Sequence, residues 1–465
     1  RIEIGEIETL LNEHPVLQAA VVVVQEVRGE KRLVAYVVGK GQGAGGKEQG
    51  AGGQNAASLR AYLKQKLPDY MIPAFFVQLE AFPRTANDKV DRNALPPPDL
   101  SQRATALVAP RDALERELCA IWQQVLDAPA VGIHDNFFEL GGQSLLAVQL
   151  IAYVQKALGR ELPVALLFQA PTIAELAAVL RQQQTTPAWS PLVAIQPRGA
   201  KPPLFCMPGM GGHVFGFYTL ARCLGSDQPV YGLQMRGLDG RAAPHTTIEE
   251  MAAEYVAAIR ERQPHGPYHL LGHSLGGMVA FEMAQQLCRA GETVAPLLIL
   301  DMFAPPLQPE IDAAHADDPS WWSTLAGYLE ALTNTEIKLA TAHLAQQTPD
   351  EQLAHFQQAL EAAHLLPAGS DLHQVRGMAA VFRANQRLSY TPQATHPVPI
   401  CLLQAAERNA VRESAYPREP TWGWSRYAAG AVTVSVTPGD HFTMLIEPNV
   451  QALARKLLEG QWQIQ

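Results

Sequence analysis

The segment Gly272–Gly277, which reads GHSLGG, has the residue types and spacing of a turn that exposes a nucleophilic serine. An apolar run at 268–271 precedes this turn, and a helix-like segment at 278–287 follows it. On such a strand–turn–helix the serine is held in a strained backbone conformation, and the residues two before and two after it must be small. Glycine occupies both positions, so we predict that Ser274 is a nucleophile. The simpler alternative is a serine that only caps the following helix.

A serine nucleophile needs a general base, and the base needs a carboxylate that orients it. Where the serine lies on this kind of turn, the chain order is serine, acid, histidine. Among the 14 histidines, His441 follows the last predicted strand, in a loop that can fold over the turn. Asp301 ends the strand next after the nucleophile and Glu407 follows a later strand, so either could orient His441. His273 adjoins the serine, but its side chain leaves the sharp turn in another direction, and we expect it to be structural.

The oxyanion that forms when a serine attacks a carbonyl needs two preorganised N–H donors. The backbone of Leu275, at the start of the helix after the turn, is the first candidate. The second should come from the loop 208–212, which reads PGMGG and follows the first strong strand. Its glycines keep the backbone open to close approach. An ordinary flexible turn is the alternative for this loop.

A second serine, Ser144, lies in the segment Leu140–Leu145, which reads LGGQSL. The paired glycines place this serine at the N-terminal end of a long predicted helix. Free N–H groups and the helix dipole favour anions at that end. A phosphodiester on Ser144 would therefore be stabilised, although the spacing by itself is more typical of a helix cap.

The composition argues against several other classes of function. The formal net charge is −9 and no basic stripe is present, so we expect no nucleic-acid binding. No apolar run reaches the ~18 residues of a membrane span. The five cysteines are scattered and form no CxxC pair, so we expect no metal site, no disulfide framework and a cytoplasmic location. Because the chain begins at Arg1 without an initiator Met, we expect a piece of a longer protein.

The 465 residues are enough for about three domains. Residues 1–99 predict a small α+β unit, in which a helical pattern precedes two β-rich runs, Ala19–Val24 and Leu33–Val38. A Gly/Gln/Ala tract at 39–54 predicts a flexible loop, and another amphipathic helix follows it. Residues 108–184 predict a compact bundle of helices with short connections.

From residue 190 to 465, strands alternate with helices, as in an α/β sheet that is covered on both faces. A proline-rich stretch at 185–203 predicts a linker that leads into this sheet. The insertion at about 303–395 has mostly helical patterns, and we expect it to cover the nucleophile turn as a lid. The predicted strands are Pro203–Met207, Pro229–Gln234, Tyr268–Leu271, Pro296–Leu300, Pro399–Leu403 and Ala431–Val436.

Two motifs in the first domain resemble the last core motifs of the adenylation domains of nonribosomal peptide synthetases. They are Arg1–Glu8, RIEIGEIE, and Asn87–Arg92, NDKVDR. The resemblance implies that residues 1–99 form the C-terminal subdomain and that Lys89 reaches the acyl-adenylate site, where it stabilises developing charge. Asp88 stands where the family usually has glycine. Since the large ATP-binding subdomain is absent from this sequence, ATP and Mg²⁺ are expected only together with that core.

The segment Asp135–Leu145, DNFFELGGQSL, strongly resembles a peptidyl carrier protein. The resemblance implies a four-helix carrier bundle in which Ser144 bears 4′-phosphopantetheine. A phosphopantetheinyl transferase would attach this group from coenzyme A. Gln143 stands where the family more often has Asp or His, which removes a charge near the arm and leaves the attachment chemistry intact.

The last domain resembles the type I thioesterase, an α/β-hydrolase, that ends a nonribosomal peptide synthetase. In that family the acid follows the strand next to the nucleophile, which selects Asp301 over Glu407. The same resemblance points to the backbone N–H of Met210 as the second oxyanion donor. The fold class implied for the chain is therefore multidomain: a small α+β subdomain, a carrier bundle and an α/β-hydrolase with a helical lid.

The order of the three parts implies the end of a termination module, with an adenylation core and condensation domains upstream. A peptidyl or acyl thioester held at Ser144 would move to Ser274, with His441, held by Asp301, as the base. Water, or an amine or hydroxyl of the same chain, would then release it by hydrolysis or ring closure. Two other hypotheses are a free-standing esterase or lipase with unrelated N-terminal helices, and a non-catalytic carrier or docking scaffold.

Overall fold

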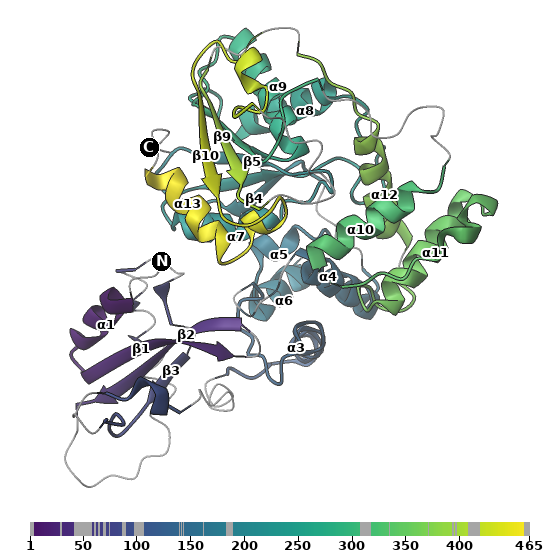
Figure 1. Ribbon diagram of the computed structural model, residues 1–465. Helices are drawn as coiled ribbons and strands as arrows, with labels where there is room; N and C mark the ends of the chain where they lie inside the picture. Colours follow the sequence, from purple (N-terminus) through teal and green to yellow (C-terminus); the bar gives the residue numbers. More distant parts are fainter. Residues whose placement is uncertain are drawn as a thin grey trace. The chain divides into compact units, whose positions relative to one another are not determined.

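The chain forms two units in the computed structural model, Arg1–Pro110 with Pro129–His134 and Arg111–Ala128 with Asp135–Gln465 (Figure 1). Lys89, Asp88 and Gln143 lie outside the described residues, as does most of the predicted loop at 39–54. The structure describes residues 4–27, 30–40, 58–59, 62–63, 66–67, 71–73, 75–85, 90–96, 107–138, 140, 142, 144–160, 162–182, 189–306, 318–333, 335–370, 372–392, 395, 398–407 and 419–459.

The first unit is built on an antiparallel hairpin that a third strand extends. The strand order is β1-β2-β3, with β1 and β2 antiparallel and β2 and β3 parallel. Successive residues of the apolar runs face opposite sides, so Val22 and Ala35 pack with the first helix while Val21 and Val34 form a second cluster. The two predicted β-rich runs lie within β1 and β2. The elements are α1 (Ile4–Asn12), β1 (Leu17–Val27), β2 (Glu30–Gly39), β3 (Phe75–Gln78) and the 3-10 helix η2 (Arg92–Ala94).

Four helices open the second unit: α3 (Ala113–Leu126), α4 (Ser144–Leu158), α5 (Leu166–Gln169) and α6 (Ile173–Gln182). Asp112 caps α3 by accepting a hydrogen bond from the N–H of Glu115. The Glu115 carboxylate is fully buried and accepts hydrogen bonds from Arg111 and Arg181. Since Arg181 belongs to α6, this carboxylate joins the first and last of these helices.

A seven-stranded sheet follows, in the order β10-β9-β8-β7-β5-β6-β4. Neighbouring strands are parallel except β4, which pairs antiparallel with β6. The central strands are continuous apolar runs because both faces of the sheet are covered. The strands are β4 (Leu192–Gln196), β5 (Leu204–Met207), β6 (Val230–Leu233), β7 (His269–His273), β8 (Leu297–Leu300), β9 (Ile400–Ala405) and β10 (Val432–Thr437).

Strand β4 corrects one sequence prediction. The linker predicted at 185–203 is wrong for residues 192–196, which form an edge strand with Val193 and Ile195 buried. Pro191 and Pro197 flank the strand without removing any of its own N–H donors. Proline is tolerated beside an edge strand, so a proline-rich stretch does not exclude one.

Helices cover the two faces of the sheet (Figure 1). Helices α8 (Ile248–Arg262) and α9 (Leu275–Arg289) pack together on one face, and α7 (Gly216–Leu224) and α13 (Asn449–Glu459) pack together on the other. Helix α9 is buried along most of its length and contacts β5, β7 and β8. The segment that begins at Leu275 is therefore fixed against the centre of the sheet.

The insertion between β8 and β9 is helical where the structure describes it. It holds α10 (Trp321–Thr333), the 3-10 helix η5 (Thr341–Gln346), α11 (Pro349–Ala362) and α12 (Leu372–Gln386). Its aromatic residues pack mainly within the insertion, where Trp321 stacks on Trp322 and Trp322 contacts Phe356.

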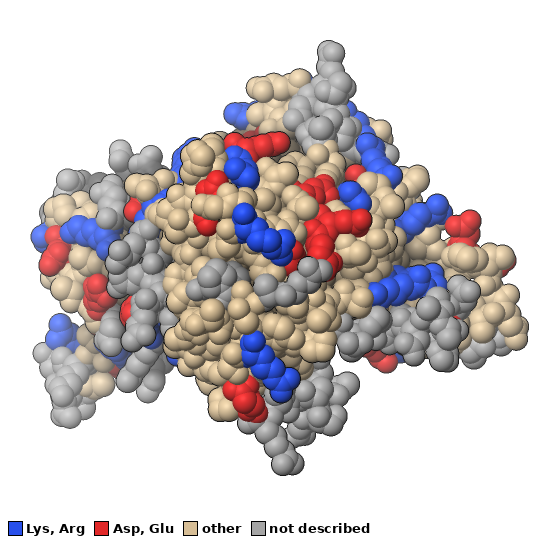
Figure 2. All heavy atoms as spheres, turned by 90° about the horizontal axis from the view of Figure 1, so that it is seen from above, with Lys and Arg blue, Asp and Glu red and all other residues tan. Residues whose placement is uncertain are grey.

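In the part of the chain that the structure describes, no helix is both long and apolar enough to cross a membrane. On the face in Figure 2, acidic and basic side chains are interspersed among uncharged ones.

Candidate active site

The turn between β7 and α9 holds Ser274 with φ 54° and ψ −131°. Strain of this kind costs on the order of 1–3 kcal/mol and persists where packing imposes it. A Cβ on Gly272 would lie 2.1 Å from the carbonyl oxygen of Gly276, and one on Gly276 would lie 2.2 Å from that of Met207. Both glycines are therefore demanded by backbone contacts, as the motif predicts.

Three side chains form a continuous hydrogen-bonded chain at this turn. Nε2 of His441 lies 3.0 Å from Oγ of Ser274, and Nδ1 of His441 lies 2.7 Å from Oδ2 of Asp301. All three residues are buried, with exposed fractions of 9%, 5% and 5% for Ser274, Asp301 and His441. Because β7 and β8 are adjacent and parallel, their carboxyl ends bring Ser274 and Asp301 together, and the loop after β10 brings His441 to them.

The environment of Asp301 keeps its carboxylate charged. Burial by itself would raise the pKa of Asp301, but its hydrogen bond with His441, the charge of that ring and the N–H of Ala405 together hold the pKa below its ordinary range. The Ala405 N–H donates to Oδ1 at 2.8 Å, which leaves Oδ2 for His441. The carboxylate is therefore oriented by the backbone and positioned to stabilise a protonated imidazole.

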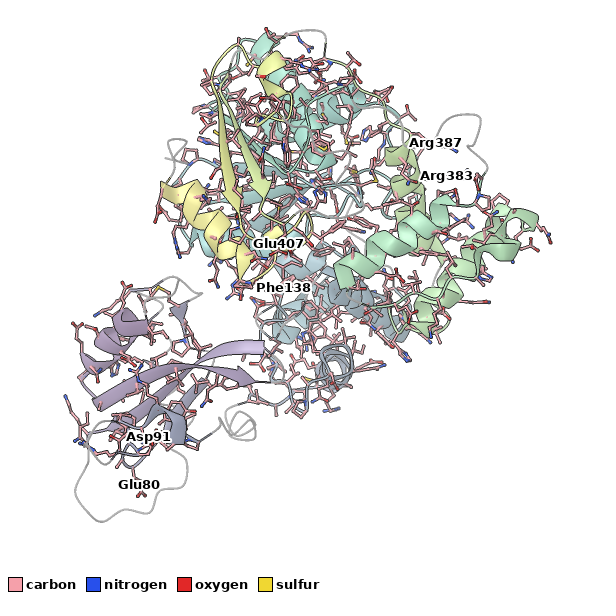
Figure 3. All side chains as sticks on the ribbon, in the orientation of Figure 1. Glu80, Asp91, Phe138, Arg383, Arg387 and Glu407 are labelled. Carbon is pink, nitrogen blue, oxygen red and sulfur yellow. The ribbon has the colours of Figure 1, made fainter. Side chains whose placement is uncertain are left out.

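Glu407, the other acid that the sequence left open, does not reach the ring. It lies exposed beyond the end of β9, and its N–H donates to the carbonyl of Gly439 at 3.0 Å (Figure 3). Both ring nitrogens of His441 already face Asp301 and Ser274. The structure thus brings Asp301, and not Glu407, to the histidine.

Two residues near the triad hold the His441 loop. Nε2 of His273 lies 2.8 Å from the backbone carbonyl of His441, so that nitrogen is the donor. Oδ1 of Asp440 accepts hydrogen bonds from the N–H groups of Phe442 and Thr443 and from the Thr443 hydroxyl. The sequence predicted a structural His273 but gave no role to Asp440, although Asp side chains commonly accept a hydrogen bond from the backbone two residues on.

Leu275 and the loop that contains Met210, which were expected to supply the oxyanion donors, both adjoin Ser274. Leu275 directly follows it as the first residue of α9. A Cβ on Gly209 would lie 3.1 Å from the Cβ of Ser274, so the loop 208–212 passes beside the serine. The N–H of Gly212 donates to the carbonyl of Gly209 at 3.0 Å, which closes a turn around Met210.

Ser144 is the first residue of α4, as predicted, and its side chain lies outside the described part of the chain. The residue two before it, Gly142, is buried, and a Cβ there would lie 2.3 Å from the ring of Phe137. Its N–H donates to the Phe137 carbonyl at 3.0 Å. The entry to α4 is thus fixed by close packing that glycine permits.

Among the described residues, no group of three or more His, Cys, Asp or Glu could hold a metal ion.

Comparison with known protein families finds three matches in order along the chain. The AMP-binding enzyme C-terminal domain matches residues 6–89, the phosphopantetheine attachment site matches 116–180, and the thioesterase domain matches 202–459. The last match covers more than half of the chain. This order does not favour a free-standing esterase or a non-catalytic scaffold.

Several long synthetases are similar to this chain. Chondramide synthase cmdD of Chondromyces crocatus is 37% identical over 475 residues, which cover 98% of this chain and 12% of that protein. A dimodular nonribosomal peptide synthase of Bacillus subtilis (strain 168) is 45% identical over 304 residues, 65% of this chain and 12% of that protein. The chain therefore spans about an eighth of the length of these curated relatives.

One solved structure is similar over almost the whole chain. It is holo-AB3403, a four-domain nonribosomal peptide synthetase bound to AMP and glycine, with 34% identity and a TM-score of 0.54. The match covers 99% of this chain and 33% of that one.

Proposed function

Because this chain belongs to the thioesterase domain family, joined to the carrier and adenylation-type domains of nonribosomal peptide synthetases, we propose that it ends a termination module and releases the finished acyl or peptidyl chain. Its parts are an adenylation C-terminal subdomain at 1–99, a four-helix carrier at 108–184 and a thioesterase at 190–465 with a lid at about 303–395. An adenylation core and condensation domains act upstream. None of the five cysteines, all of which the structure describes, forms a disulfide. We place the chain in the cytoplasm, where thiols are kept reduced.

The carrier part fits 4′-phosphopantetheine. Ser144 supplies the hydroxyl for the phosphodiester at the start of α4, where the first-turn N–H groups favour an anion. Gly142 lets the chain enter α4 against Phe137. When bound, the group supplies the thiol that presents the acyl chain, and a phosphopantetheinyl transferase attaches it from coenzyme A.

The release reaction follows from the residues around Ser274. His441 removes the Ser274 proton through Nε2 as Oγ attacks the thioester carbonyl, and Asp301 stabilises the imidazolium that forms. The N–H groups of Met210 and Leu275 stabilise the oxyanion. The C–S bond breaks, the sulfur takes the proton from His441, and the acyl group is left as an ester on Ser274.

The second half of the reaction reverses these roles. His441 takes a proton from water, or from an amine or hydroxyl of the bound chain, as that group attacks the ester. The Ser274 oxygen leaves and regains its proton from His441. Hydrolysis or macrocyclisation follows from which nucleophile enters.

The first domain contributes Lys89 to a different reaction. Its role is charge stabilisation in the acyl-adenylate site, which needs ATP, Mg²⁺ and the upstream adenylation core. The release reaction does not use this step, so we expect it to proceed without ATP.

The observation that carries the proposal is the hydrogen-bonded chain from Ser274 through His441 to Asp301 on a strained turn. The test supplies a small diffusible acyl thioester to the wild type and to Ser274→Ala. We expect the variant to lose about 10³-fold or more in kcat, with no acyl adduct by mass spectrometry. Undiminished release by the variant would exclude the thioesterase proposal.

A second measurement tests the carrier. The chain is incubated with coenzyme A and a phosphopantetheinyl transferase, and its mass is compared with that of Ser144→Ala. We expect the added arm on the wild type alone. If Ser144 stays unmodified while diffusible esters are hydrolysed, the esterase hypothesis is correct.

A further inference from the structure

The oxyanion loop, residues 208–212, contacts the helical insertion as well as Ser274. Gly209 lies beside the Ser274 side chain, whereas Met210 packs against the apolar cluster of the insertion. A loop held on one side by the sheet and on the other by a separate group of helices takes its shape from both.

Asn385, in the last turn of α12, makes the most direct of these contacts. Its Nδ2 donates to the backbone carbonyl of Met210 at 2.6 Å and lies 3.0 Å from Sδ of Met235. Asn385 is 4% exposed, so loss of this bond would leave a buried polar group unpaired. Fixing the Met210 carbonyl fixes the peptide that follows the proposed donor, and thereby the direction of the loop.

Tyr328, in α10, lies against the next residue of the loop. A Cβ on Gly211 would lie 2.4 Å from the Tyr328 hydroxyl oxygen, so the phenol packs directly against the Gly211 backbone. Burial raises the pKa of Tyr328 to about 12, so the phenol stays neutral at physiological pH. The same ring packs against Phe442, the residue after His441, with ring centroids 5.9 Å apart.

Helices α10 and α12 pack against each other, so the contacts of Asn385 and Tyr328 with the loop depend on the same pair of helices. The Tyr328 ring packs against Phe382 at 5.2 Å, and the Arg383 guanidinium lies 5.2 Å from the Trp321 ring centre (Figure 3). Movement of either helix would therefore disturb both anchors of the loop.

We propose that Asn385 and Tyr328 are positioning residues, through which the insertion sets the oxyanion loop in its working conformation. The inference rests on the proposed function, because it takes the N–H of Met210 as an oxyanion donor. It makes the oxyanion hole dependent on the seating of α10 and α12, so the insertion controls transition-state stabilisation as well as access.

The test compares Asn385→Leu, which keeps the side-chain size and removes the donor, with the wild type. Loss of one oxyanion donor typically lowers kcat by about 10²–10³-fold, and a misplaced donor should cost less, about 10–100-fold. We expect that fall in kcat for acylation and for deacylation alike, with KM within about twofold and an unchanged pH profile. An unchanged kcat, or an effect on KM alone, would overturn the proposal.

The matched control is Gln357→Leu. Gln357 is another buried amide of the insertion, and its Nε2 donates to the carbonyl of Ser370 at 2.9 Å, away from the loop. We expect it to lower the melting temperature comparably while kcat stays within about twofold. An equal loss of kcat in the control would show that Asn385 acts only through general stability.

Tyr328→Phe gives an independent reading if the Asn385 variant fails to fold. It removes the hydroxyl that packs against Gly211 and keeps the ring contacts, so a smaller fall in kcat, about 3–10-fold, is expected. Wild-type kcat in Tyr328→Phe would then refute the proposal. Ser274→Ala distinguishes failure of the proposed function from failure of the positioning role. If Ser274→Ala still releases the acyl chain, the proposed function is wrong. If Ser274→Ala abolishes release and the Asn385 and Tyr328 variants keep the wild-type kcat, only the positioning role is wrong.

Discussion

At the scale of single residues, the arrangement of Ser274, His441 and Asp301 depends on groups that are far apart in the chain. The turn lifts the serine, the backbone N–H of Ala405 fixes one oxygen of Asp301, and His273 fixes the carbonyl of His441. Each acts by removing freedom from a neighbour, because catalytic geometry must be held within fractions of an ångström. Asp301 and His441 are thus each held by a hydrogen bond that involves a backbone group.

Asp301→Asn should lower kcat by about 10³–10⁴-fold with little change in structure. The amide would present an N–H to Nδ1 of His441, so the proton would sit on Nε2 and the ring could no longer accept one from Ser274. Steady-state release of a diffusible thioester measures this. Glu407→Gln is the control and should stay within about twofold, whereas a large loss in the control alone would make Glu407 the acid.

At the scale of elements, short helices depend on polar contacts that a hydrophobic pattern does not reveal. Helix α3 shows the spacing of an amphipathic helix, yet its buried face includes the carboxylate of Glu115. Arg111 from the preceding segment and Arg181 from α6 both donate to it. A buried carboxylate with two guanidinium partners specifies how α3 and α6 meet.

Glu115→Gln should weaken the carrier helices in a pH-dependent way. The hydrogen bond from Arg111 is the main cause that lowers the pKa of Glu115 from 4.5 to about 2. Because the pKa of Glu115 is lower in the folded protein than in the unfolded chain, the ionised carboxylate stabilises the fold fully above pH 4.5. This stabilisation is lost as the pH falls through about 2. Hydrogen exchange of an α3 peptide should therefore show lower protection in the variant at pH 7.

The difference between wild type and variant should shrink as the pH falls from 4.5 towards 2. Glu117→Gln, at an exposed position of the same helix, should match the wild type throughout. A constant difference at every pH would mean that shape, and not charge, accounts for the loss.

At the scale of the whole molecule, the carrier helices and the hydrolase sheet belong to one unit. Phe138 stacks on Tyr218 of α7 with ring centroids 3.9 Å apart, and Phe168 stacks on Phe215 at 5.0 Å (Figure 3). The carrier helices also contact the insertion, where Gln149 of α4 donates a hydrogen bond to the carbonyl of His364. The helix that begins at Ser144 thus contacts the insertion that we propose to be a lid.

Tyr218→Ala should slow transfer from the carrier without harming the hydrolase. An aromatic pair contributes about 0.5–1.5 kcal/mol, so single-turnover release of a chain loaded on Ser144 should fall about 2–10-fold. Release of a small diffusible thioester should stay unchanged, because it bypasses the carrier. Thr219→Ala, next along α7, is the control, and equal slowing of both substrates by Tyr218→Ala would contradict this role.

The sequence by itself determined the features that local physics enforces. Gly272 is dictated by a contact with Gly276 inside the turn, and six of the seven strands of the sheet were predicted from β-rich runs of the sequence. The matches to carrier and thioesterase families confirm the resemblance that the motifs indicated. Short segments suffice for such features because the residues that decide them are neighbours in the chain.

Only the tertiary structure decided what depends on distant segments. From the residues alone, Asp301 and Glu407 were equivalent, and the fold separated them by pointing one strand end at His441. Strand β4 reads LVAIQ, a short apolar run between two prolines, and only its pairing with β6 identifies it as an edge strand. Asn385 reaches Met210 across 175 residues of sequence, and no local signal can encode that hydrogen bond, because its free energy arises when the insertion packs against the loop.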